Sequence, residues 1–477
     1  MFSFIFILSL FSCKKLLEIK ETDAIVGDVA LQTVENTEQG IIGAYALMNV
    51  EMSILLNATL SDEVKVGEFY NAGTTHEWQY TSTDIGIRDN FTATTPFYRL
   101  IDRANRVLLA LPKAQPLRGP SDEAIRTRVR GEALFLRAFA HFELYRYYSG
   151  SSDPNALAMA YLETPTLTGQ ARIPVGPYFQ KLKADMTEAK NLLPASLPTA
   201  ETAGSRATKM AVTGLQSRVH LYLREWADAI TFSTEYINAL PLATRAQFPG
   251  IWTDANTTEV AFRLIRAPNV RVGGLFRGTS TRNTAGDTLL GTVTWVPSDK
   301  LWNSYSQTTD IRFSSYLRNE PLLTRDNNRN SRIIHKYRGG GYTSPTENSN
   351  HIKVFRTGEM ILNRAEARAE NNDLTGAAAD LNTLRAARIE GYVNEVFTSK
   401  DALITAIINE RFKELAFEGH RFWDLRRKNL PVERLASDAP NAASRVLPAG
   451  NFRFRLPIPN AEIQANPLIV QNEGYTN

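Results

Sequence analysis

The 477-residue sequence is poor in the residue that forms disulfides and thiolate metal sites, because it contains a single cysteine, Cys13. One thiol cannot form an internal disulfide, and it excludes zinc and iron–sulfur sites that need several cysteine ligands. A chain of this length can bury a large hydrophobic core without such cross-links. The sequence therefore predicts a fold that its core holds together.

The sequence also lacks an excess of charge of one sign. Lys and Arg number 54 and Asp and Glu number 50, so the net charge is only +4. This balance gives no basic surface of the kind that binds nucleic acid, and we expect no nucleic-acid partner. With 43% hydrophobic and 22% charged residues, the composition is that of a folded chain rather than a disordered one.

Local motifs for catalysis and for cofactors are missing as well. The sequence contains no GxxxxGK[ST], GxSxG or HExxH motif, and its six histidines are scattered. We therefore predict no metal site and no cofactor. Two carboxylates that meet only in space leave no local spacing, so a glycoside hydrolase stays open as an alternative.

One short hydrophobic run stands at the start of the chain. The eleven residues from Met1 to Phe11 are apolar apart from serines, and Ser12 and Cys13 follow them. The run is shorter than the ~20 residues of a membrane-spanning helix, and its length is typical of a signal peptide. Leu10 to Cys13 resembles the lipobox of bacterial lipoproteins, in which the cysteine is acylated. We predict a signal peptide over 1–12, a lipid anchor at Cys13 and a tether over 13–34, with no later run long enough to span a membrane.

The rest of the chain is predicted to be mostly helical. Apolar residues recur every three or four positions over 35–52, 97–111 and 121–148, which is typical of amphipathic helices. Two shorter helices are expected after Pro177 and Lys209. The predicted fold class is all-α dominated, with long irregular loops and a few short strands.

Two helix pairs show a repeat-like pattern. Over 209–239, the small residues Ala211 and Gly214 alternate with the large residues Leu215 and Tyr222 across two short helices. This pattern resembles a tetratricopeptide unit, in which small residues let paired helices approach closely. A second candidate pair covers 359–369 and 373–388. Because the two pairs are divergent and far apart in the sequence, a regular solenoid is not predicted.

Two long segments, 57–95 and 241–350, have a different composition. They are rich in Gly, Thr, Ser, Asn and aromatic residues, and they include strand-like stretches at 259–265 and 289–296. Long irregular segments inside a helical scaffold are uncommon and are usually functional. We therefore expect the ligand site in these loops.

The C-terminal third contains the most specific pattern. Residues 355–367 read FRTGEMILNRAEA, residues 381–385 read LNTLR, and residues 410–427 read ERFKELAFEGHRFWDLRR. Shorter matches occur at 131–138 and 456–459. Together these motifs resemble the signature of the SusD/RagB family, and the resemblance runs from Cys13 to the end of the chain.

The resemblance implies a function that periodicity alone does not show. Members are surface-exposed outer-membrane lipoproteins of Bacteroidetes that capture glycans or other nutrients for a SusC-like TonB-dependent transporter. It also implies a scaffold of tetratricopeptide-like helix pairs, a ligand site in irregular loops, and a binding protein rather than an enzyme. A single domain is expected over 35–477.

The charged residues of the signature have a structural interpretation of their own. Glu410, Arg411, Glu414, Glu418 and Arg421 alternate in sign at spacings of three and four residues. This spacing favours ion pairs along and between helices rather than catalysis. The aromatic residues between them are predicted to lie in the core.

Candidate ligand residues must be chosen from composition, because no motif marks them. Sugars present apolar C–H faces rimmed by hydroxyls, so their sites combine flat aromatic rings with polar side chains. The leading aromatic platforms are Trp78 and Trp302, and the other candidates are Tyr70, Tyr80, Trp295 and Tyr305. An alternative hypothesis is a tetratricopeptide-type scaffold whose groove binds a peptide or a partner protein.

Overall fold

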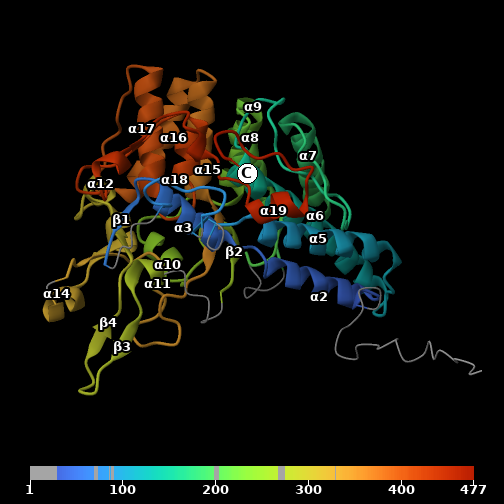
Figure 1. Cartoon of the computed structure of the whole chain (residues 1–477), viewed down its shortest axis with the longest axis horizontal. Coiled ribbons are helices and arrows are strands. Elements are labelled where there is room, and N and C mark those ends of the chain that lie inside the picture. Colours follow the sequence, from blue (N-terminus) through green and yellow to red (C-terminus); the bar gives the residue numbers. More distant parts are fainter. Residues whose placement is uncertain are drawn as a thin grey trace, which may run out of the picture.

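A computed structural model describes residues 30–68, 74–84, 86–87, 91–197, 204–266, 274–327 and 329–476. The predicted signal peptide, the predicted anchor Cys13, most of the predicted tether and Tyr70 lie outside these residues. Helices fill the top and the right of Figure 1, and a loop-rich region with short strands lies at the lower left.

Long helices dominate the described residues, as the sequence predicts. They are α2 (Val34–Tyr45), α3 (Val50–Leu60), α5 (Thr94–Ala110), α6 (Pro120–Tyr148), α7 (Val175–Leu192), α8 (Lys209–Tyr222), α9 (Trp226–Ala239), α15 (Thr357–Glu370), α16 (Leu374–Arg388) and α17 (Lys400–Glu414), and the seven-residue α18 (Arg421–Arg427) follows α17. The shorter ones are α10 (Phe248–Trp252), α11 (Gly274–Arg277), α12 (Asp299–Ser304), α13 (Ile311–Tyr316), α14 (Pro321–Asn327), α19 (Asn460–Ala465) and the 3₁₀ turns η2 (Leu111–Lys113), η3 (Ala442–Ser444) and η4 (Phe452–Phe454).

The first predicted helix, over 35–52, is wrong as one continuous element. Helix α2 ends at Tyr45, and α3 starts at Val50 after Asn49, whose side chain accepts a hydrogen bond from the Met52 N–H. An Asn at this position favours a new helix start, because it satisfies an N–H group that has no partner within the helix. Two helices therefore replace one.

The stretch 34–60 is long and apolar enough to cross a membrane by length and composition, and 56% of its most apolar window is buried inside the protein. The break after Tyr45 divides it into helices of 12 and 11 residues. Each is shorter than the ~20 residues that a span requires, so these helices serve the core.

The two predicted tetratricopeptide-like pairs are confirmed as α8–α9 and α15–α16. Helix α9 also packs against α15, so the pairs stack in space although more than a hundred residues separate them. Gly214 on α8 lets strand β8 approach this scaffold closely, because a Cβ atom there would lie 2.8 Å from Cγ of Phe355 on β8. The small residues of the pattern thus allow close packing.

The strands form short antiparallel ribbons around this scaffold. They pair as β1 (Val64–Val66) with β5 (Trp295–Pro297), β2 (Val260–Leu264) with β8 (Ile352–Arg356), β3 (Ser280–Arg282) with β4 (Thr288–Leu290), β6 (Leu317–Asn319) with β7 (Arg332–Ile334), and β9 (Val432–Glu433) with β10 (Val446–Leu447). The predicted strand at 259–265 is confirmed as β2. The predicted strand at 289–296 is wrong as a single element, because β4 and β5 share it and leave 291–294 outside both.

The main hydrophobic core joins the helices to the inner ribbons. Tyr147 of α6 and Trp423 of α18 lie with ring centroids 5.5 Å apart in this core. A separate small cluster of Leu290, Val293 and Val296 with two further residues lies under the loops. The loop-rich region therefore has apolar support of its own and can hold side chains in fixed positions.

Candidate ligand-binding site

The charged signature residues form a buried ion network, as their spacing predicts. The carboxylate of Glu414 accepts hydrogen bonds from Arg356 at 2.5 Å and from Arg312 and Arg388 at 3.1 Å each. All four side chains are at most 1% exposed. The three guanidinium groups hold the pKa of Glu414 far below its ordinary value against the opposing effect of burial.

A second part of this network fixes the start of the first loop region. Asp62 accepts two hydrogen bonds of 2.8 Å from Arg421 at the start of α18. The neighbouring carboxyl of Glu63 accepts a hydrogen bond from the Phe417 N–H, and burial raises its pKa to about 8. The signature thereby positions the loop that precedes β1. Asp62 and Glu63 thus have structural partners in the signature.

The β1–β5 ribbon brings the two predicted loop regions together. Val66 of β1 lies opposite Trp295 of β5, and Ser298 just beyond β5 donates a 2.7 Å hydrogen bond to the Asp62 carbonyl oxygen. Segments more than 200 residues apart thus form one surface, which lies at the left of Figure 1 near the β1 label. Neither segment alone could build it.

Trp295 is half-buried on this ribbon and rests on a histidine. The centroids of the Trp295 and His76 rings are 5.0 Å apart. Burial, together with the charge of Arg434, lowers the pKa of His76 to about 3, so the imidazole is neutral at physiological pH. Nδ1 of His76 lies 2.7 Å from the Thr59 carbonyl oxygen. The tryptophan therefore has a firmly held, uncharged support.

Polar side chains follow directly after His76. Glu77 accepts a 2.8 Å hydrogen bond from the side-chain amide of Asn441 and a longer one of 3.5 Å from Gln79. Gln79 and Asn441 are exposed, and Glu77 is half-buried. A half-buried tryptophan beside carboxylate and amide groups is the combination that a sugar ring requires. We call Trp295, His76, Glu77, Gln79 and Asn441 the ribbon site.

The predicted platforms in the first loop region are buried. Trp78 is 4% exposed, its indole N–H donates a 2.9 Å hydrogen bond to the Leu60 carbonyl oxygen, and the Arg434 guanidinium covers its ring at 4.1 Å. Tyr80 is 1% exposed and donates to the Arg453 carbonyl oxygen. Protein groups cover these rings in this conformation, so stacking on a ligand would require them to move.

Trp302 and Tyr305, at the end of α12, are covered in the same way. Trp302 is 2% exposed, with the Arg332 guanidinium 4.7 Å from its ring centroid and Phe313 edge-on at 4.8 Å. Tyr305 is 5% exposed and donates a 2.8 Å hydrogen bond to the Lys413 carbonyl oxygen. Of the five predicted aromatics that the structure describes, Trp295 has the most accessible ring.

Sequence reasoning missed three members of the ribbon site. His76 and Glu77 carry no motif, and Asn441 comes from a segment 364 residues after Glu77. No local spacing connects them, because the fold alone brings them together. Gln79 lies in a loop that was singled out, but its exposure depends on the same folding.

One group of possible metal ligands occurs among the described residues, on the α8–α9 pair. Atoms of His220, Glu225 and Asp228 lie within 4.8 Å of one another. Lys183 already donates to both oxygens of Glu225, at 2.5 and 2.7 Å. The lysine supplies the positive charge that these carboxylates need, so the group is explained as an ion-pair cluster.

Comparison with known families and sequences shows similarity over nearly the whole chain. A family model described as the SusD family matches residues 278–475, and another, described as starch-binding associating with outer membrane, matches residues 15–221. SusD-like protein P38 of Formosa agariphila is 24% identical over 97% of this chain and 96% of its own length. SusD-like protein P25 of the same organism is 22% identical over 99% and 97%.

Solved structures share the fold. A SusD superfamily protein from Bacteroides thetaiotaomicron superposes with a TM-score of 0.78 at 22% identity, over 92% of this chain and 99% of its own. A laminarin binding SusD-like protein gives 0.71 at 20%, over 93% and 100%. Surface glycan-binding protein A from B. thetaiotaomicron, in complex with laminarihexaose, gives 0.71 at 18%, over 92% and 99%.

Proposed function

The chain belongs to the SusD/RagB family, and on this basis we propose that it is a surface-exposed outer-membrane lipoprotein that binds a glycan and passes it to a SusC-like TonB-dependent transporter. The observation that carries the proposal is the match of both halves of the chain to family models, one of which is described by starch binding and the outer membrane. Calorimetric titration of the protein with a panel of glycans tests it.

We propose the ribbon site as the place of binding. The half-buried ring of Trp295 would take the C–H face of a sugar, and Glu77, Gln79 and Asn441 would bond to its hydroxyls. Trp78, Tyr80, Trp302 and Tyr305 stay predicted contacts that would first have to become exposed, because protein groups cover their rings. Tyr70 stays a predicted contact from the same loop.

We propose that the chain is a binding protein without a cofactor and not a hydrolase. The signature carboxylates support this, because Glu414 is held by three arginines and Glu418 by Lys336 and Arg356. A carboxylate in such a cluster is stabilised as the anion and is a poor general acid. The organisation into a signal peptide over 1–12, a tether over 13–34 and one domain over 35–477 belongs to the same proposal.

The lipid anchor yields a prediction of its own. Cys13→Ala should move the protein from the membrane fraction to the supernatant, because acyl chains on this thiol would provide the membrane attachment. Ultracentrifugation of lysed cells and an immunoblot of both fractions measure the change. Ser12→Ala is the matched control, since it keeps a small residue before the cysteine and should leave the protein in the membrane fraction. A Cys13→Ala protein that sediments as wild type does would refute the anchor.

A further inference from the structure

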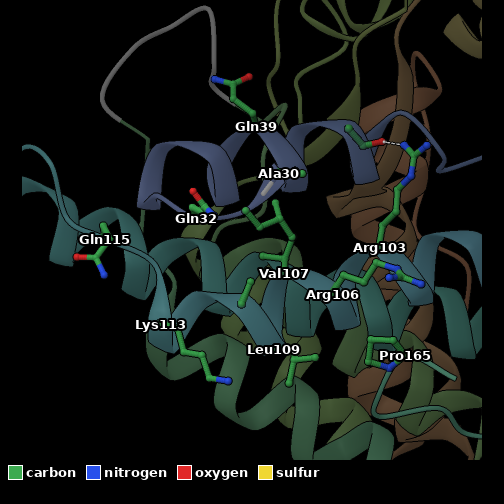
Figure 2. A pocket seen from close by; sticks show the side chains of 14 residues that line it. Ala30, Gln32, Gln39, Arg103, Arg106, Val107, Leu109, Lys113, Gln115 and Pro165 are labelled. Carbon is green, nitrogen blue, oxygen red and sulfur yellow. Dashed lines mark hydrogen bonds between the residues drawn. The ribbon is translucent and has the colours of Figure 1, made fainter. Parts of the chain in front are cut away.

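A pocket of about 740 Å³ lies between α2 and α5, at the opposite side of the molecule from β1 in Figure 1. Figure 2 shows Val107 pointing from α5 towards α2, with Arg103 and Arg106 near each other at one end. None of the described residues of the two predicted loop regions lines it. The pocket is therefore separate from the ribbon site.

The inner part of the pocket is apolar. Val107 is 1% exposed, and Leu31 lies near it across Gly40. A Cβ atom on Gly40 would come within 2.9 Å of Leu31 and 3.1 Å of Val107, so the glycine lets these side chains form a continuous apolar wall. At the mouth, Leu109 is 61% exposed. A large exposed leucine at a pocket mouth offers a contact for an apolar chain.

The rim of the pocket is basic. Arg103, Arg106 and Lys113 line it, and none of the other described residues that line it is Asp or Glu. Arg103 donates a 2.8 Å hydrogen bond to the Gly43 carbonyl oxygen, which fixes its guanidinium at the rim. Arg106 donates a 2.7 Å hydrogen bond to the carboxylate of Asp102. Figure 2 shows the two arginines at one end of the pocket and Lys113 at the other, and the arginine pair beside an apolar wall is complementary to a ligand with an anionic head and a hydrocarbon tail.

The position of the pocket in the chain indicates where such a ligand would come from. Ala30 lines the pocket and follows Cys13 by 17 residues (30 − 13). A segment of that length spans at most ~60 Å when fully extended. If Cys13 carries the proposed lipid, the pocket stays within this distance of the membrane surface.

We propose that this pocket binds the headgroup of an anionic membrane lipid. The phosphate would lie against Arg103 and Arg106 at one end of the pocket, and the first part of an acyl chain would lie along Val107 and Leu109. The contact would hold one side of the protein against the membrane and limit how the tethered domain turns. Lipid binding at this pocket requires neither the glycan nor the anchor, so this proposal can fail or succeed independently of the proposed function.

The test uses short-chain lipids that stay monomeric in water. The full chain carrying Cys13→Ala is titrated calorimetrically with dihexanoylphosphatidylglycerol, dihexanoylphosphatidylcholine and inorganic phosphate. We expect the anionic lipid to bind at least about tenfold more tightly than the zwitterionic one, since two guanidinium groups would face the headgroup. Raising the salt concentration from 50 to 500 mM should weaken binding of the anionic lipid, because the charges lie at the surface.

Three variants in the same background locate the site. Arg106→Glu and Leu109→Asp should each weaken binding of the anionic lipid at least about fivefold, the first through charge and the second through lost apolar contact. Both residues are exposed, so the fold should persist. Lys209→Glu, at the start of α8 and outside the pocket, is the control that should change nothing.

Three results would overturn the proposal. They are equal binding of the two lipids, phosphate binding as tightly as the anionic lipid, and unchanged binding in both pocket variants. Trp295→Ala should keep full lipid binding, which separates this site from the glycan site.

Discussion

Glu414→Gln is expected to lower the free energy of unfolding by about 3–5 kcal/mol, the usual cost of removing one partner from a buried ion pair. The substitution leaves Arg312, Arg356 and Arg388, which are at most 1% exposed, without the anion that they share. A glutamine keeps the shape and loses the charge, so the effect reports electrostatics rather than a cavity. Urea denaturation followed by circular dichroism measures it.

Glu188→Gln provides the matched control. Glu188 pairs with Arg130 at 2.6 Å, but both side chains are more than 40% exposed. Such a surface pair contributes less than about 1 kcal/mol. If Glu414→Gln were no more destabilising than Glu188→Gln, the buried network would not be a determinant of the fold.

The same substitution should change the acid sensitivity of the protein. The pKa of Glu414 is lower in the folded chain than the ordinary value of about 4.3. Its stabilising effect is therefore complete above that pH and is lost as the pH falls towards the folded pKa. Between pH 6 and pH 3 we expect the wild type to lose more stability than the variant. Parallel curves would contradict the role of Glu414.

Trp295→Ala is expected to weaken glycan binding by about 30-fold or more, since losing an aromatic anchor typically costs about 2 kcal/mol. Its ring is the most accessible of the described candidate platforms, and His76 supports it at 5.0 Å. Isothermal titration calorimetry with a glycan that the wild type binds gives the two dissociation constants.

Two further variants decide what the loss means. Trp226→Ala removes another half-buried tryptophan, on α9 of the helical scaffold, and should leave the affinity unchanged. Trp295→Tyr keeps a flat ring and should restore part of the binding. Equal losses in Trp295→Ala and Trp226→Ala would place the ligand elsewhere or show that both variants unfold, and the melting temperature of each separates these results.

Much of the fold could be predicted because its determinants are local. The apolar spacing over 97–111 and 121–148 gave helices whose ends agree within three residues with α5 and α6. The small residues of 209–239 identified the α8–α9 pair, since they are typical of closely packed helix pairs. The alternating charges of the signature predicted ion pairs, but Arg312, Arg356 and Arg388, the partners of Glu414, come from other segments that the spacing does not identify.

Features that depend on distant segments could not be predicted. Trp78 and Trp295 both lie in loop-like sequence, yet Arg434 covers one ring, and the other remains partly exposed on a ribbon. No sequence feature near Trp78 or Trp295 indicates this difference in exposure. The break between α2 and α3 was missed because its apolar pattern continues through 46–49, where the Asn49 cap decides the start of α3.

The most direct test is a titration of the purified full chain with a glycan panel that begins with laminarihexaose, in which heat and newly formed reducing ends are measured in the same sample. We predict that at least one glycan gives saturable heat, that Trp295→Ala removes this heat, that Trp226→Ala retains it, and that no reducing ends appear. Release of reducing ends would reveal a hydrolase. A panel without any binding glycan, together with a peptide or protein that binds the helical face, would support the scaffold hypothesis and contradict glycan capture at the ribbon site.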